Sequence, residues 1–308
     1  MPVAPAWARS AAEEVVGALS RAEAGWIVAA VVLHVSGQLC RGLAWRNILA
    51  ASWPGVRRRR ACAWHVCGSG LSGVLSSRGG DAVRIAVAKR ELPGATWPAL
   101  AGTLVAEASF EAVLGLALTL AAVSIGVGML TSPSLAGLGT VAALLALGGL
   151  LAARSRRVRR IAAELCRGAA VLRHPGRFGV QVVPWQVAGR VLRMAAVWCF
   201  LHAAGLPAGP AMVVAATVVQ GSGNGIPIPG AGIAAAAAGL LVALPVAAGG
   251  PVDPAAVATL AVLQPATLTL VGVSLSVALL AALVGVRTPR ALLAAVRAPA
   301  LRPADATS

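Results

Sequence analysis

Long apolar runs alternate with short basic segments along the chain. The runs lie at about residues 25–45, 61–75, 96–130, 135–153, 182–204, 211–248 and 255–286, and several approach the roughly 20 apolar residues that a helix needs to cross a bilayer. This pattern predicts an all-α polytopic membrane protein with about six to eight membrane elements, because helices satisfy their own backbone groups in lipid. We expect an amphipathic segment (residues 1–24), an integral membrane domain (25–286) and a basic tail (287–308).

A helix break interrupts the apolar region between residues 211 and 248. The segment from Ile226 to Gly232 contains two prolines one residue apart, and proline lacks the N–H that a helix interior requires. Irregular backbone survives at membrane depth only inside protein or beside a watery cavity, and the broken helices of transporters surround their substrate sites. The break therefore predicts a substrate site.

The short apolar run at residues 61–75 lies between two basic segments. Arg57 to Arg60 precede it, and further basic residues between Arg78 and Arg90 follow it. Cytoplasmic loops are rich in Lys and Arg, so both flanks are expected on the cytoplasmic side. The run would then enter the membrane and return as a re-entrant element. A full crossing with an exposed basic loop is the alternative.

An internal repeat relates the two interrupted runs. A shift of 153 positions lays Gly68–Gly70 onto Gly221–Gly223 and Leu75–Gly79 onto Ile228–Gly232. Two matches at one offset, both at short interrupted runs in corresponding halves, indicate a repeat whose broken helices meet at a central site. Chance similarity of small residues is the alternative.

The chain has a formal net charge of +16, from 26 Lys and Arg residues against 10 Asp and Glu. In a soluble protein this excess would suggest nucleic acid, but the arginines cluster between apolar runs, above all at residues 154–177, and no motif of a nucleic-acid-binding fold is present. The distribution predicts cytoplasmic loops beside anionic lipid headgroups. We expect a multi-pass protein of the cell (inner or plasma) membrane, with no nucleic-acid partner.

The five cysteines form no CxxC motif and no evenly spaced framework, so reduced thiols are expected. Cys62, His65 and Cys67 have a spacing that could hold a metal, but no second ligand pair follows nearby. Small residues in a membrane helix are the preferred interpretation. No metal and no cofactor are expected.

Charged residues inside apolar runs are candidates for function, because each costs on the order of 2.5–3.5 kcal/mol at mid-membrane. Glu107 and Glu111 lie four positions apart and share a helix face. They are either a counter-charge or proton site in a cavity, or a buried pair that locks helices together. Asp81 and Arg84 could form a solvated pair, or they could leave Arg84 at a cavity mouth as a phosphate contact.

Arg190 and Arg193 share one face of the run at residues 182–204. Their long stems could carry the charges to the membrane interface. Alternatively, the two guanidinium groups could bind a lipid phosphate bidentately. His34 and Gln38, four apart in the first run, are expected to hydrogen-bond across helices rather than to catalyse.

The residues around the proline break are candidates for headgroup binding. Ser222 and Asn224 could satisfy freed backbone groups or meet a headgroup. The helix that restarts after Gly230 would point the N–H groups of Ala231 and Gly232 into the site, where they favour an anion.

Two segments together resemble a known family. Leu75 to Arg84, followed by Glu107 and Glu111, resembles the first motif of the flippase-like integral membrane family typified by the transmembrane region of lysylphosphatidylglycerol synthase. Ile228–Pro229–Gly230 resembles its second motif. The resemblance covers about residues 30–285 and implies movement of a lipid, or of a lipid-linked headgroup, between leaflets.

The chain departs from the family pattern at informative positions. Ser76 and Ser77 replace a Pro-Gly pair, Asp81 replaces a glutamate, and Ala236 occupies the position of the second motif's glutamate. The family's synthase domain has no counterpart in this sequence. The missing glutamate bears on the substrate and on any proton coupling that the resemblance implies.

These observations predict that the protein flips an anionic phospholipid or a lipid-linked precursor and is not an enzyme. The alternative is a non-transporting scaffold that positions a lipid-modifying or glycosyltransfer enzyme as its partner. A membrane-embedded transferase is the third option. Its acid or base could only be Glu107 or Glu111, and the absence of a nucleophile with an adjacent base speaks against it.

Overall fold

The computed structural model describes residues 22–75, 77–127, 155–223 and 231–284, and these segments form helices and turns without a strand. The predicted all-α class is confirmed for this part of the chain. The expected span at residues 135–153, most of the N-terminal segment and the basic tail lie outside the described residues. The helices are α2 (Ala24–Leu49), α3 (Arg58–Leu75), α4 (Ser77–Glu91), α5 (Trp97–Ser124), α7 (Arg156–Gly168), the 3₁₀ turn η2 (Ala170–Arg173), α8 (Pro175–Gln181), α9 (Val183–Ala203), α10 (Pro210–Gly223), α11 (Ala231–Ala248) and α12 (Pro254–Val284).

Three of the described helices are long and apolar enough to cross a membrane: α2, α5 and residues 254–283 of α12. Their outward faces carry large apolar side chains, such as Val113 on α5 and Leu270 on α12, which are 70% and 71% exposed. Such a surface suits lipid and not water. These helices indicate a multi-pass membrane protein. The α9 helix, which contains two arginines, is not among the three.

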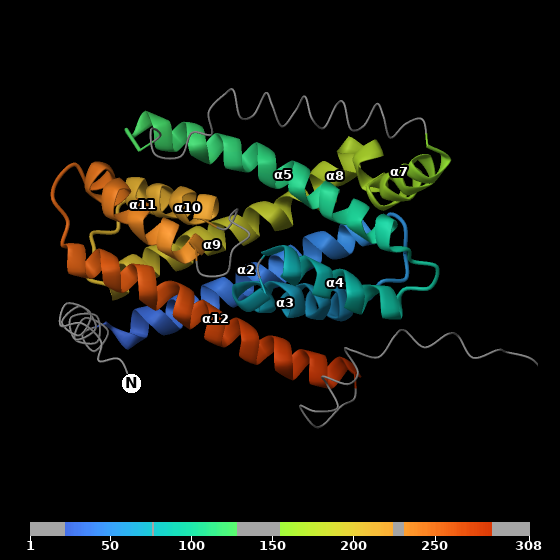
Figure 1. Ribbon diagram of the computed structural model, residues 1–308, viewed down its shortest axis with the longest axis horizontal. Coiled ribbons are helices and arrows are strands. Elements are labelled where there is room, and N and C mark those ends of the chain that lie inside the picture. Colours follow the sequence, from blue (N-terminus) through green and yellow to red (C-terminus); the bar gives the residue numbers. More distant parts are fainter. Residues whose placement is uncertain (1–21, 76, 128–154, 224–230, 285–308) are drawn as a thin grey trace, which may run out of the picture.

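Two antiparallel helices, α2 and α9, form the centre of the bundle, with α5 and α12 along its opposite edges (Figure 1). They approach closely at two glycines, because a Cβ on Gly37 would lie 3.1 Å from the carbonyl oxygen of Gly189. At one end of the pair, Trp26 of α2 stacks on His202 of α9 with ring centroids 4.8 Å apart. Small residues at such a crossing allow close helix packing in a membrane.

The α3 and α4 helices form a hairpin whose two ends return to the same place. Arg60, near the start of α3, pairs with Glu91, the last residue of α4, at 3.4 Å. Midway along the hairpin, a Cβ on Gly68 would lie 2.6 Å from the carbonyl oxygen of Gly80, so only glycine fits. The start of α3 and the end of α4 therefore lie together, but the apolar run itself is one continuous helix and the charged helix α4 makes the return. Re-entry of the run stays a prediction. The hairpin also packs on α12, where the hydroxyl of Ser276 donates to the carbonyl of Val66 at 3.2 Å.

The α10 and α11 helices form a second pair on either side of the proline break. Gln220 of α10 and Gln264 of α12 exchange two amide hydrogen bonds, of 2.8 and 2.9 Å. The α11 helix runs through Pro245 and ends before Gly249, whose φ of 69° suits glycine. Pro245 has no N–H to donate to the carbonyl four residues earlier, so one intrahelical hydrogen bond is absent there.

The described part of the basic segment, residues 155–177, is largely helical and not an extended loop. Its first helix, α7, packs on the start of α5 by backbone contact, with Gly168 against Ala99 and Gly102 against Leu165. The hydroxyl of Thr96, which caps α5, donates to Glu164 of α7 at 2.8 Å. The arginines of α7 are thereby fixed beside one end of the α5 span.

A candidate charged site between α2, α4, α5 and α9

Glu107 of α5 is the centre of a buried cluster of charges. Its carboxylate accepts from Arg41 Nη2 at 2.9 Å and from Arg84 Nη1 at 2.8 Å. The residue is only 4% exposed. A buried carboxylate needs such partners, because an uncompensated charge in low dielectric is strongly unfavourable. Glu107 therefore holds α2 and α4 against α5.

Arg84 of α4 uses its guanidinium group in four directions. In addition to Glu107, it donates to Asp81 Oδ1 at 2.9 Å and contacts Nδ1 of His65 at 2.7 Å. It also lies over the ring of Trp45, 4.7 Å from the centroid, which is favourable for a cation. The side chain is buried, and the predicted local pair with Asp81 is present within this larger network.

Glu111, one turn further along α5, has two arginine partners. Arg41 Nη2 lies 3.3 Å from its Oε1, and Arg190 of α9 pairs with its Oε2. Arg190 thus turns inward to a carboxylate. The shared helix face predicted for the two glutamates has a clear consequence here, because Arg41 bridges both of them.

Arg193, one turn beyond Arg190 on α9, differs from the other arginines of the cluster. Among the residues that the structure describes, it has no carboxylate partner and no hydrogen bond. It interacts electrostatically with Arg41, Arg190 and Glu111, so it belongs to the same field. Four arginines therefore face three carboxylates, Asp81 included, and the cluster carries one excess positive charge.

The cluster lies deep along its helices. At about 1.5 Å per residue, Glu111 is roughly 21 Å from the start of α5 and Arg193 roughly 15 Å from the start of α9. A hydrocarbon core is about 30 Å thick. If these helices cross the membrane, the cluster lies near its middle, where charged residues are found at functional sites.

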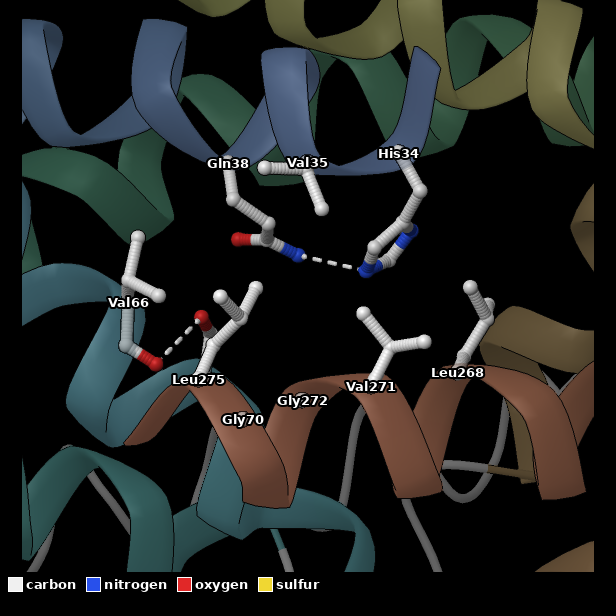
Figure 2. A pocket seen from close by; sticks show the side chains of 10 residues that line it. His34, Val35, Gln38, Val66, Gly70, Leu268, Val271, Gly272 and Leu275 are labelled. Carbon is white, nitrogen blue, oxygen red and sulfur yellow. Dashed lines mark hydrogen bonds between the residues drawn. The ribbon is translucent and has the colours of Figure 1, made fainter. Parts of the chain in front are cut away.

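A chain of hydrogen bonds leads from the cluster to a small pocket. His65 Nε2 lies 3.2 Å from Gln38 Oε1, and the other end of that amide lies 3.3 Å from His34 Nε2. Figure 2 shows Gln38 and His34 side by side on α2, facing the pocket. The pocket has a volume of about 30 Å³, enough for one or two water molecules. Its lining residues come from α2 (His34, Val35, Gln38), α3 (Val66, Ser69, Gly70) and α12 (Leu268, Val271, Gly272, Leu275).

The structure brings together all the charged residues that the sequence singled out inside apolar runs. It adds Arg41, and it adds His65, which the sequence suggested only as a possible metal ligand with Cys62 and Cys67. Arg41 lies near the end of the first apolar run, close to a basic stretch, and α2 continues to Leu49 and keeps it in the helix. Its spacing from Gln38 and His34, three and seven positions, would have placed all three on one helix face.

The predicted contacts around the proline break are described only in part. Asn224 and Gly230 lie outside the described residues, and the side chain of Ser222 is not described. Ala231 and Gly232 open α11. In the described part of the chain, no group of three or more His, Cys, Asp or Glu residues could hold a metal ion. His65 instead contacts Arg84 and Gln38.

Comparisons with family models, with curated proteins and with solved structures found no match for this chain.

Proposed function

We propose that this protein moves a lipid with an anionic headgroup between the leaflets of a membrane. The observation that carries the proposal is Arg193, a cation without a described partner beside a network of ion pairs deep in the helical bundle. Arg193 is half-buried, and a charge without a partner is unfavourable at membrane depth, so such a residue is expected to have an external counter-ion. A lipid phosphate is the anion that a membrane supplies, and arginine binds phosphate well.

The charge balance of the cluster points to the charge of the headgroup. One excess positive charge is neutralised by one negative charge. A phosphodiester headgroup with no other charge has that value, whereas a phosphomonoester or a diphosphate carries more. We therefore propose a singly charged phosphodiester lipid as the substrate.

The order of the helices supports a repeat of two halves. Shifted by 153 positions, the starts of α3 and α4 fall within one residue of the starts of α10 and α11. The end of α2 likewise falls within one residue of the end of α9. Because α2 and α9 run antiparallel, the halves would be inverted in the membrane, which is the arrangement of many transporters. The two hairpins would then be the re-entrant elements.

The two halves differ in chemistry. The first hairpin brings charged residues to the centre, whereas the second joins α12 through the self-satisfied amide pair of Gln220 and Gln264. The same asymmetry appears in the resemblance to flippase-like proteins, since Ala236 stands where the second motif has a glutamate. Substrate recognition is therefore assigned to the first half and to Arg193.

Lipid movement by the purified protein in proteoliposomes tests this proposal. Fluorescent lipids with headgroup charges of zero, minus one and minus two are placed in both leaflets, and a membrane-impermeant quencher reports exchange between them. We expect the singly charged phosphodiester to move fastest. Arg193→Gln should reduce its movement by roughly 10- to 100-fold, the loss of one or two charge-assisted hydrogen bonds.

Arg156→Gln is the matched control, because Arg156 lies on the exposed surface of α7 and should leave the rate unchanged. If the wild-type protein moves no lipid but retains a lipid-modifying enzyme through purification, the scaffold alternative replaces the proposal. Equal movement of neutral and anionic lipids would contradict the role of Arg193.

A further inference from the structure

Arg84 fixes the donors and acceptors along the hydrogen-bond chain that leads to the pocket. Arginine has only donors, so the 2.7 Å contact with Arg84 Nη1 obliges Nδ1 of His65 to accept. In the neutral ring, Nε2 then carries the proton and donates to Oε1 of Gln38 at 3.2 Å. The NH₂ group of Gln38 consequently faces Nε2 of His34 at 3.3 Å, and that nitrogen must accept. One arginine thus dictates the tautomers of two histidines.

We infer that His34 is a proton-binding site that is coupled to Arg84 through Gln38 and His65. A proton from water in the pocket adds to His34 Nε2, the nitrogen that had accepted from Gln38, and turns it into a donor. Gln38 must then rotate its amide, so that Oε1 faces His34 and the NH₂ group faces His65. Nε2 of His65 now has to accept. Its proton is given to water, and Nδ1 takes one from water, so His65 stays neutral and the net uptake is one proton.

The rearrangement ends at Arg84. Nδ1–H of His65 and Nη1–H of Arg84 would be two donors facing each other, so the 2.7 Å contact between them is lost. Arg84 still has Glu107 at 2.8 Å and Asp81 at 2.9 Å, and it moves toward these carboxylates. Protonation in the pocket therefore changes the position of an arginine in the charged cluster.

The surroundings of His34 connect this proton to the anion site. The charged groups that act on His34 are Arg193 from α9 and Arg41 from its own helix. The pocket residues of α12 are uncharged, and those of α3 are uncharged as well. An anion bound at Arg193 offsets one of the two cations that oppose a proton on His34. Anion binding and proton binding then favour each other, and by linkage the effect is reciprocal.

The carboxylates of the cluster are poorer proton sites. Glu107 accepts from two arginines and Glu111 pairs with two, so a proton on either would displace an ion pair. Within the described part of the chain, His34 has one side-chain hydrogen bond to lose, the one from Gln38. The proton site expected from the sequence at the glutamates is therefore placed on a histidine at the pocket.

Nitrogen-15 NMR of the histidine rings tests the coupling without any assay of lipid movement. The chain has four histidines, so single substitutions assign each signal. At neutral pH, the full-length protein in nanodiscs should show Nε2–H on His65 and Nδ1–H on His34. His34→Lys supplies a permanent donor at the pocket and should switch His65 to the Nδ1–H tautomer. His34→Gln keeps an acceptor and should leave His65 unchanged.

The double variant His34→Lys/Gln38→Leu removes the connection, and His65 should then keep its Nε2–H tautomer. Should His34→Lys fail to fold, acid titration of the wild type replaces it, and the tautomer of His65 should change in step with protonation of His34. An unchanged His65 in either experiment would overturn the inference. The link to lipid movement rests on the proposed function: a tautomer switch in a protein that moves no lipid would refute that function and leave the proton site standing.

Discussion

Replacing Glu107 by glutamine tests how far the charged cluster stabilises the bundle. The side chain keeps its size but loses its charge, so two buried arginine contacts, at 2.9 and 2.8 Å, lose their anion. The new amide can still accept from one arginine, whereas its NH₂ group faces the other as donor to donor. Removal of one partner from a buried ion pair typically costs about 3–5 kcal/mol, and we expect a loss in that range.

The free energy of unfolding in mixed micelles, followed by circular dichroism, measures this effect. Glu164→Gln on α7 is the matched control: its pair with Arg167 is 3.8 Å long and partly exposed, and the new amide oxygen can still accept from Thr96, so the change should cost about 1 kcal/mol or less. Glu111→Gln, whose side chain is 26% exposed, should fall between the two. A Glu107→Gln variant as stable as the Glu164→Gln variant would refute the reasoning.

Two further substitutions test the packing that surrounds the site. Gly102→Ala should detach α7 from α5, because the added Cβ would overlap a backbone carbonyl of α7. Thermal unfolding should show a loss of stability of about 1–3 kcal/mol for this variant. Gly115→Ala is the control and should show no such loss, because the space around Gly115 is open. Gln220→Leu alone should destabilise the protein by about 1–3 kcal/mol, because it leaves Gln264 buried without its partner. In a double-mutant cycle, the added change Gln264→Leu should recover most of that loss. Additive losses would show that the two amides do not interact.

The residues of the charged site were predictable from the sequence, but their pairing was not. A charge inside an apolar run stands out because lipid excludes it, and this identified Glu107, Glu111, Arg190 and Arg193. Which arginine meets which carboxylate depends on how α2 and α9, far apart in the chain, cross. Arg41 was missed because the drop in hydropathy around it resembles the end of a span, whereas packing on α9 continues the helix to Leu49.

The helical nature of the basic segment was also missed. Its high charge hides a repeating apolar face in α7, formed by Val158, Ile161 and Leu165 at spacings of three and four positions. The hairpin of α3 and α4 was anticipated only in part. Basic residues on both flanks predicted a return of the chain, but the apolar run stays one helix, α3, and the helix that returns is the charged α4, whose end meets Arg60 at Glu91.

The order in which the cluster's residues occur along the chain bears on how α5 enters a membrane during synthesis. Its two glutamates would make insertion costly if they entered alone. Both of the arginines that pair with Glu107 precede it in the sequence, at positions 41 and 84, so they are already made when α5 leaves the ribosome. Arg190 is made later and adds a second partner to Glu111. The first half of the chain can therefore form ion pairs with both glutamates of α5 before the second half is synthesised.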